Sequence, residues 1–323
     1  MINISFILIL LSCAHFSLYA SDNQFVKNTN AKDNKELLDT YRQYSPFTDP
    51  GEYAYLYENL SDSLPELCKL IRSQYIHPYG ELNKFRDLIP EERWDEAFKY
   101  PTVQSILKGL ISYDSSGLTN ERKPEDRLVL GCRHNAILLA SILKYRGIPA
   151  RVRCGHVTYL IPDFHTSHTI CEVWNEDEKR WMLVDPSTDK VDFNSEQFDF
   201  SNELWLKLQK GEIDPNHYGI PGRYSGYTSI VGKICPDLAS LLGAEYPINQ
   251  YAPILEYATD SVNQLASEQI ELLNKICELM KSIDAENLSK LQDIYNNTPE
   301  IQITKSFESV STNSDNSTGP NTN

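Results

Sequence analysis

Apolar residues recur at helical spacing in the first half of the chain. A helix is predicted over residues 64–74, because apolar side chains share one face there and Pro65 with Glu66 suits a first turn. Two shorter helices are predicted over residues 91–100 and 102–112. The apolar face of the first helix consists of Leu64, Leu67, Cys68 and Ile71. Together these segments predict an N-terminal helical layer.

The segment from Cys132 to Tyr145 predicts a buried helix. Its apolar residues cover most of the helix surface, and Gly147 followed by Pro149 stops it. These residues are Ala136, Ile137, Leu139, Ala140, Ile142 and Leu143. A helix that is apolar on most sides packs in the interior of a protein. Cys132 is the predicted first residue of this helix.

Three strands are predicted directly after the buried helix. Residues 150–160, 168–174 and 180–185 are rich in β-branched and aromatic side chains. The polar segment 175–178 makes the turn between the last two strands. A helix followed by an antiparallel sheet is the predicted centre of the fold.

The last third of the chain predicts mostly helices. Trp205 and Leu208 begin a helical stretch, residues 215–226 form a loop rich in Pro and Gly, and residues 261–282 and 285–295 form a helical pair. Helices, an antiparallel sheet and further helices, in that order along the chain, predict the α+β class.

The two ends of the chain differ from the middle. The apolar run of residues 4–12 is too short to span a bilayer and leads to Ala20, whose small side chain suits signal peptidase. A signal peptide over residues 1–20 and a secreted or periplasmic protein are therefore predicted. Alternatively, the stretch that ends at Cys13 resembles a bacterial lipoprotein box. Residues 311–323 carry no large apolar side chain and predict a disordered tail.

Composition and charge narrow the choice of partners. The 323 residues are 41% hydrophobic and 23% charged, values typical of a chain that folds. Thirty Lys plus Arg against 45 Asp plus Glu give a net charge of -15, which repels phosphate backbones and anionic membranes. After the N-terminal run no stretch reaches membrane-spanning length. We expect no nucleic-acid partner and no stable membrane insertion.

Cys132 lies where a thiol gains reactivity. At a helix start, free backbone N–H groups and the helix dipole favour an anion, so the thiolate is stabilised and the pKa of the thiol is lowered. The same N–H groups are suited to holding the oxyanion of a tetrahedral intermediate. The sequence therefore predicts a nucleophile at this position.

A histidine and an aspartate are predicted to meet across the last two strands. If the turn is centred between Glu176 and Asp177, His168 falls directly opposite Asp185. Cross-strand partners have Cβ atoms about 4.5 to 5.5 Å apart. The carboxylate then accepts a hydrogen bond from the imidazole and sets its tautomer. A turn of odd length would shift this register.

The motifs around these three residues resemble the transglutaminase-like superfamily. That resemblance implies a papain-like core and a triad in which Cys132 is the nucleophile, His168 the base and Asp185 the orienting carboxylate. The motifs are Gly131-Cys132-Arg133-His134-Asn135-Ala136, Tyr145-Arg146-Gly147-Ile148-Pro149-Ala150-Arg151, Ser167-His168 and Trp181-Met182-Leu183-Val184-Asp185-Pro186. They occur in the family's order, and each falls in the expected structural context.

Segments outside the triad are similar to one uncharacterised bacterial branch of that superfamily, and the similarity covers residues 48–300. These segments are Thr48-Asp49-Pro50-Gly51, Leu67-Cys68 with His77, Gly211-Glu212-Ile213-Asp214-Pro215 and the helical end through Tyr295. The predicted division is a transglutaminase-like catalytic domain with its N-terminal helical layer over residues 21–235, a C-terminal helical extension over 236–300 and a tail over 301–323, whose last part, residues 311–323, has the disordered composition described above.

The chain departs from that branch next to two triad residues. The branch has Asp where this chain has His134, and Asp-His-Trp where this chain has Ser167-His168-Thr169. Because the triad itself is intact, we expect the substrate contacts to differ rather than the chemistry.

Other residues near the triad have two interpretations each. Trp174 and Trp181 are candidates to line a substrate groove on the His168 face, or they pack in the core. Asp189 is either a second carboxylate of the site or a solvated loop residue. His77 either lies near the site or has no part in it, and it is not counted among the site residues.

The predicted activity is thiol-dependent acyl transfer on amide bonds of a protein or peptide substrate, without a cofactor. Hydrolysis is favoured over amine transfer, because small secreted relatives of this fold need no second substrate. A non-catalytic binding module on the same fold and a zinc-binding protein are the alternatives. The zinc alternative rests on residues whose spacing matches no standard zinc signature: Cys132, His134, Cys154, His156, His165, His168 and Cys171.

Overall fold

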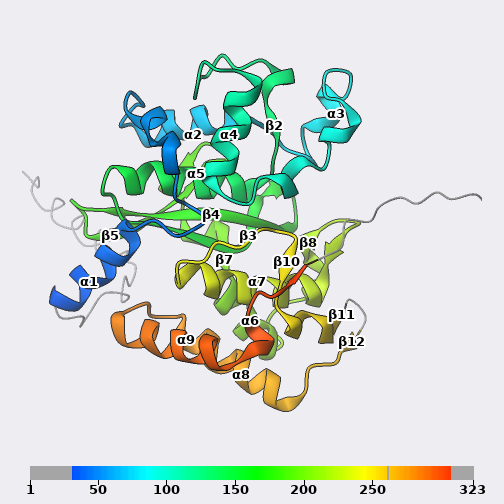
Figure 1. Cartoon of the computed structure of the whole chain (residues 1–323). Coiled ribbons are helices and arrows are strands. Elements are labelled where there is room, and N and C mark those ends of the chain that lie inside the picture. The colour runs from blue at the N-terminus through cyan, green and yellow to red at the C-terminus, as the bar shows by residue number, and fades with distance from the viewer. Residues whose placement is uncertain (1–30, 260–261, 307–323) are drawn as a thin grey trace, which may run out of the picture.

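A computed structural model of the chain describes residues 31–259 and 262–306 (Figure 1). The predicted signal peptide and residues 307–323 lie outside this range. The helices are α1 (Ala31–Arg42), α2 (Leu64–Ser73), α3 (Leu82–Phe85), α4 (Val103–Tyr113), α5 (Cys132–Tyr145), α6 (Ser201–Gln209), α7 (Gly226–Leu241), α8 (Ser267–Leu279) and α9 (Ala285–Asn297). The strands are β1 (Tyr75–Ile76), β2 (Leu128–Val129), β3 (Ala150–Ile161), β4 (Phe164–Asn175), β5 (Arg180–Asp185), β6 (Lys190–Val191), β7 (Phe198–Phe200), β8 (Tyr218–Ile220), β9 (Tyr224–Ser225), β10 (Gln250–Tyr251), β11 (Ala258–Thr259), β12 (Val262–Asn263) and β13 (Lys305–Ser306).

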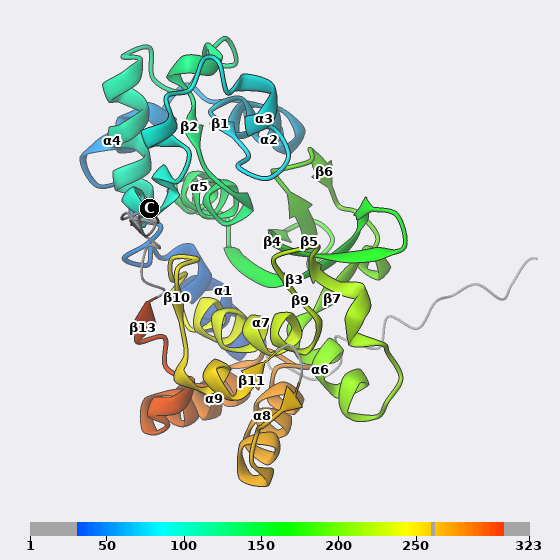
Figure 2. The same ribbon diagram turned by 90° about the vertical axis from the view of Figure 1, so that its right-hand side faces the viewer.

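A seven-stranded sheet lies between two layers of helices (Figures 1 and 2). Its strand order is β6-β5-β4-β3-β7, all antiparallel, and β8 adds to β4 in parallel and carries β9. Helices α2, α4 and α5 cover one side, and α6 to α9 lie on the other. The fold is therefore mixed, with helices and a largely antiparallel sheet, in agreement with the predicted α+β class.

The main core lies around α5, as its apolar surface predicts. Leu139 and Ile142 of α5 are fully buried in one cluster with Val173 of β4 and Ile71 of α2. The Sγ atom of Cys171 on β4 donates a hydrogen bond to the carbonyl of Ala136 at 3.1 Å. Helix α5 is thus enclosed by the sheet on one side and by the N-terminal helices on the other.

The C-terminal helices have a second core, and a buried carboxylate is among the groups that link them to the sheet. Asp237 of α7 accepts hydrogen bonds from Nε and Nη2 of Arg153 at 3.0 and 2.9 Å. It also accepts from the backbone N–H of Cys154 and from the Ser201 hydroxyl, both at 2.8 Å. A buried charge with this many partners fixes how α7 packs on β3.

The register of β4 and β5 corrects the predicted one by two positions. Trp174 pairs with Trp181 rather than with Lys179. The turn has four residues, because Asn175 Oδ1 accepts from the N–H groups of Asp177 and Glu178 at 3.0 and 3.1 Å and Lys179 adopts φ +52°. The four-residue turn was predicted at residues 175–178 and lies one residue later, at 176–179. The pairing therefore shifts by two positions, and because this number is even, each side chain stays on its expected face.

Three further element predictions are corrected. Residues 91–100 form two short 3-10 turns, because the buried ion pair of Arg93 with Glu96 ties them to β2, where Glu96 accepts from Val129 N–H at 2.7 Å. The proposed domain boundary after residue 235 falls inside α7. The tail cannot begin at 301, because Ile301 is fully buried among the C-terminal helices.

Among the described residues, no helix has both the length and the apolar character needed to cross a membrane.

Candidate active site

Cys132 is the first residue of α5, as predicted. The residue before it, Gly131, is extended and provides no side-chain cap, so N–H groups of the first turn are available to an anion. Asn135, one turn later, donates from Nδ2 to Ser187 Oγ at 2.9 Å and ties the helix start to the loop after β5. Cys132 is partly exposed. Cys132 therefore combines a helix N-terminus with partial exposure of the residue.

His168 and Asp185 are joined by a hydrogen bond of 2.9 Å between Nε2 and Oδ2. The side chains meet diagonally, since Ile170 rather than His168 falls opposite Asp185 when the ladder is continued past Val184. Opposite His168 on β3 stands Gly155, where a Cβ atom would lie 2.3 Å from the Asp199 carbonyl of β7. The glycine thus permits β7 to pack closely beside β3, the neighbour of the strand that carries His168.

Asp185 is completely buried and held on several sides. Its Oδ2 accepts from the Tyr159 hydroxyl at 2.7 Å and from the Thr188 hydroxyl at 2.8 Å, while Oδ1 accepts from the N–H of Ser187 at 2.8 Å. Burial alone would raise the pKa of this carboxyl, but the charge and hydrogen bond of His168 outweigh it and lower the pKa to about 2. The carboxylate is therefore a fixed negative charge behind the imidazole.

The thiol and the imidazole stabilise each other's charged forms. Burial by itself raises the pKa of Cys132, but His168 and then His77 lower it well below the usual value for a thiol. Burial likewise lowers the pKa of His168, but Asp185 and Cys132 raise it to about 10. Because Nε2 is engaged by Asp185, Nδ1 is the ring nitrogen left for the thiol. A thiolate–imidazolium pair is the resting state that this arrangement favours at neutral pH.

The other cysteines of the described residues lie in environments that raise the pKa of a thiol, whereas the pKa of Cys132 is lowered. Cys68, Cys154, Cys171, Cys235 and Cys277 are free thiols and are all buried. Burial raises the pKa of Cys154 to about 11 and that of Cys68 to about 12. Such thiols stay protonated and out of reach of reagents.

We expect iodoacetamide to alkylate Cys132 much faster than the five buried cysteines near pH 7. Because the pKa of Cys132 is lowered, its labelling rate should stay level as the pH falls below about 8.5, where an ordinary thiol becomes protonated and slows down. Peptide mapping after brief alkylation measures both effects. Faster labelling of Cys154 than of Cys132 would contradict this assignment of the reactive thiol.

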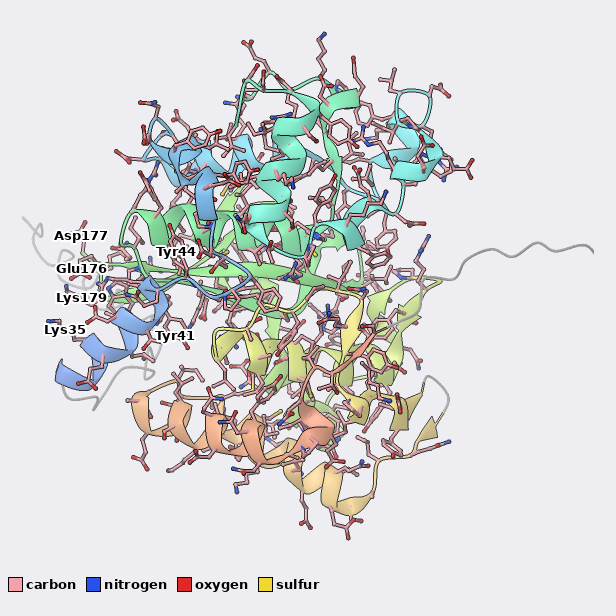
Figure 3. All side chains as sticks on the ribbon, viewed as in Figure 1. Lys35, Tyr41, Tyr44, Glu176, Asp177 and Lys179 are labelled. Atoms are coloured by element: carbon pink, nitrogen blue, oxygen red, sulfur yellow. The ribbon has the colours of Figure 1, made fainter. Side chains whose placement is uncertain are left out.

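The structure does not bring Trp174 and Trp181 to the thiol. They stack edge to face at 5.5 Å beside the β4–β5 turn, six residues or about 20 Å along β4 from His168. Trp181 also contacts Tyr41 of α1, which lies next to this turn in Figure 3, and the guanidinium of Arg151. Their proposed role in a substrate groove is corrected: they pack α1 against the hairpin.

The residues of the zinc alternative are dispersed into separate contacts. His156 pairs with Ser229 at 2.9 Å, His165 with Asp199 at 2.5 Å, and Cys171 with α5. Within residues 31–259 and 262–306, no group of three or more His, Cys, Asp or Glu side chains is arranged to hold a metal ion. The zinc alternative gains no support from this arrangement.

Three residues that sequence reasoning left out contact the triad. Tyr159 lies within the irregular stretch of β3 between Val157 and Ile161, and Thr188 lies in the loop after β5; both donate hydrogen bonds to Asp185. His77 follows β1 and lies beside Gly131, the residue before Cys132, and it lowers the pKa of Cys132. Asp189, the alternative carboxylate, instead pairs with Arg72 at 3.1 Å.

Two cavities of the described residues lie away from the triad, since neither Cys132, His168 nor Asp185 lines them. One, of about 580 Å³, is lined by the ends of β3 and β4 and by residues around His217, and the other, of about 510 Å³, lies beside α2.

Comparison of this chain with protein-family models, with curated proteins and with solved structures found no match.

Proposed function

We propose that this protein is a thiol-dependent hydrolase of amide bonds in peptides or proteins. Cys132 is the nucleophile, His168 the general base and acid, and Asp185 the group that orients His168. The observation that carries the proposal is the hydrogen bond of His168 to a fully buried carboxylate, together with a partly exposed Cys132 whose pKa His168 lowers and which raises the pKa of His168 in turn. Nucleophile, base and orienting group in this order are the arrangement that activates a thiol for acyl transfer.

The reaction follows from the resting ion pair. The Cys132 thiolate attacks the amide carbon, a C–S bond forms, and the carbonyl electron pair moves to oxygen. As that pair returns, the C–N bond breaks and the His168 imidazolium donates its Nδ1 proton to the leaving nitrogen. Neutral His168 then takes a proton from water, which attacks the thioester and releases a carboxylic acid. The thiolate and the imidazolium are restored.

Asp185 acts on His168 alone. Its negative charge favours the imidazolium, and its hydrogen bond to Nε2 directs Nδ1 toward the thiol. The similarity of the surrounding motifs to the transglutaminase-like superfamily supports the same roles and a papain-like core. In that chemistry the thioester is transferred either to water or to an amine, and we propose water as the main acceptor.

Product analysis on a peptide library tests this proposal. We expect mass spectrometry to find a new amine and a new carboxylic acid from the cleaved amide, with heavy oxygen in the acid when the reaction runs in ¹⁸O-labelled water. Addition of methylamine should leave hydrolysis dominant; a predominance of N-methylamides would assign the protein to amine transfer instead. Peptides that bind but remain uncleaved, without any adduct on Cys132, would favour a binding module.

A further inference from the structure

A second imidazole reaches the thiol from a different part of the chain. Strand β1 pairs in parallel with β2, and the N–H of Leu130 donates to the carbonyl of Ile76 at 3.1 Å. The residues that follow these two strands therefore lie side by side. His77 Nε2 is 3.9 Å from the position that a Cβ atom on Gly131 would occupy, next to Cys132.

The loop of His77 sets which of its ring nitrogens carries the proton. The backbone N–H of Tyr79 points at Nδ1 at 3.3 Å, and since this group only donates, Nδ1 is an acceptor. In the neutral ring the proton then resides on Nε2, the atom that faces Gly131. Glu81 fixes the loop, because its Oε2 accepts from the N–H of His77 at 3.0 Å and its own N–H donates to the His77 carbonyl at 3.0 Å.

His77 and His168 are therefore presented to Cys132 in different ways. His168 is paired with a buried carboxylate and exchanges a proton with the thiol, whereas His77 offers an N–H donor oriented by backbone. Against the effect of burial, first His168 and then His77 lower the pKa of Cys132. His77 thus interacts with negative charge at this position.

We infer that His77 Nε2–H is the side-chain donor of an oxyanion hole whose other donor is the backbone N–H of Cys132. This inference rests on the acyl transfer proposed above. When the thiolate attacks, its charge moves to the carbonyl oxygen, which forms beside the start of α5. An oxyanion accepts a stronger hydrogen bond than a diffuse sulfur anion does, so the same donor stabilises the transition state more than the resting thiolate.

The test compares two reactions of the same thiol. Acylation of Cys132 by p-nitrophenyl acetate passes through an oxyanion, whereas alkylation by iodoacetamide is a direct displacement and does not. We expect His77→Phe to slow acylation by about 10² to 10³-fold, the loss typical of one oxyanion donor. Alkylation should change little when both rates are measured at a pH where the thiol is fully ionised.

One further variant of His77 separates the effect of its hydrogen bond from that of packing, and a variant at a distant histidine is the control. His77→Gln retains an N–H donor and should recover part of the acylation rate that His77→Phe loses. His217→Phe, a matched change at an exposed histidine of the 215–217 turn, should leave both rates unchanged.

Each result bears on a different claim. Equal acylation rates for wild type and His77→Phe would overturn the oxyanion assignment and leave the proposed function intact. Parallel losses of acylation and alkylation would also overturn it, since they would show that His77 only supports the thiol. If Cys132 of the wild-type protein alkylates but is never acylated, the proposed function fails and the assignment fails with it.

Discussion

Replacement of Cys132 with alanine is expected to abolish amide cleavage while leaving the fold intact. Without the thiolate no covalent intermediate forms, and loss of the nucleophile in a comparable triad costs on the order of 10⁶-fold in kcat. Alanine is a good helix former at the first position of α5, and the side chain is partly exposed, so the free energy of unfolding should change by only about 0.5 kcal/mol. Turnover assays and urea unfolding measure the two effects.

Cys277→Ala is the matched control. This thiol is fully buried in α8, within the C-terminal core, so its removal leaves a small cavity and should lower the free energy of unfolding by roughly 1 kcal/mol. Activity should persist. If Cys132→Ala retained turnover, the nucleophile would have to be another group and the proposed mechanism would be wrong.

The central elements could be predicted from the sequence because local signals agree there. Helix α5 begins and ends where the apolar pattern and Gly147 with Pro149 place it, and β5 spans the predicted residues 180–185. Strand β3 ends one residue after the prediction, and β4 begins four residues earlier. In such segments propensity, burial and turn residues all favour the same structure.

The contact of His168 with Asp185 was predicted although the register was not. A hairpin register depends on the turn, and the hydrogen bonds of Asn175 with φ +52° at Lys179 place the four-residue turn at 176–179. The polar sequence does not distinguish this position from the predicted one, which begins one residue earlier. The two side chains keep a common face of the sheet because the register shifts by two positions, an even number. An imidazole is long enough to reach a carboxylate in the diagonal position, so the hydrogen bond between His168 and Asp185 forms in the observed register as well.

The role of His77 could not be predicted from the pattern along the chain. Strands β1 and β2 have two residues each, too few to show alternation, and they join segments about fifty residues apart.

Helix α7 was not predicted from the sequence, for a different reason. Pro236 lies in its interior, where proline removes a helical hydrogen bond and predicts a break, but buried Asp237 compensates through its contacts with β3.

Asp185→Asn is expected to keep the fold but lower turnover by about 10⁴-fold, the loss known for the same change in a serine protease triad. The amide cannot stabilise an imidazolium, and it can favour the wrong tautomer of His168. In the unaltered protein the pKa of His168 is raised to about 10, so the protonated form, which is the general acid of the proposed mechanism, is lost only above that pH. Removal of the negative charge should move the alkaline limb of the pH–rate profile to lower pH.

Asp189→Asn separates this effect from a general change in loop charge. Asp189 lies four residues away and pairs with Arg72 rather than with His168, so its substitution should cost far less activity and leave the alkaline limb in place. Its backbone has φ +59°, a conformation that asparagine tolerates, so the variant should fold normally. Equal losses at both positions would contradict the assignment, because of these two carboxylates only Asp185 is hydrogen-bonded to the imidazole of His168.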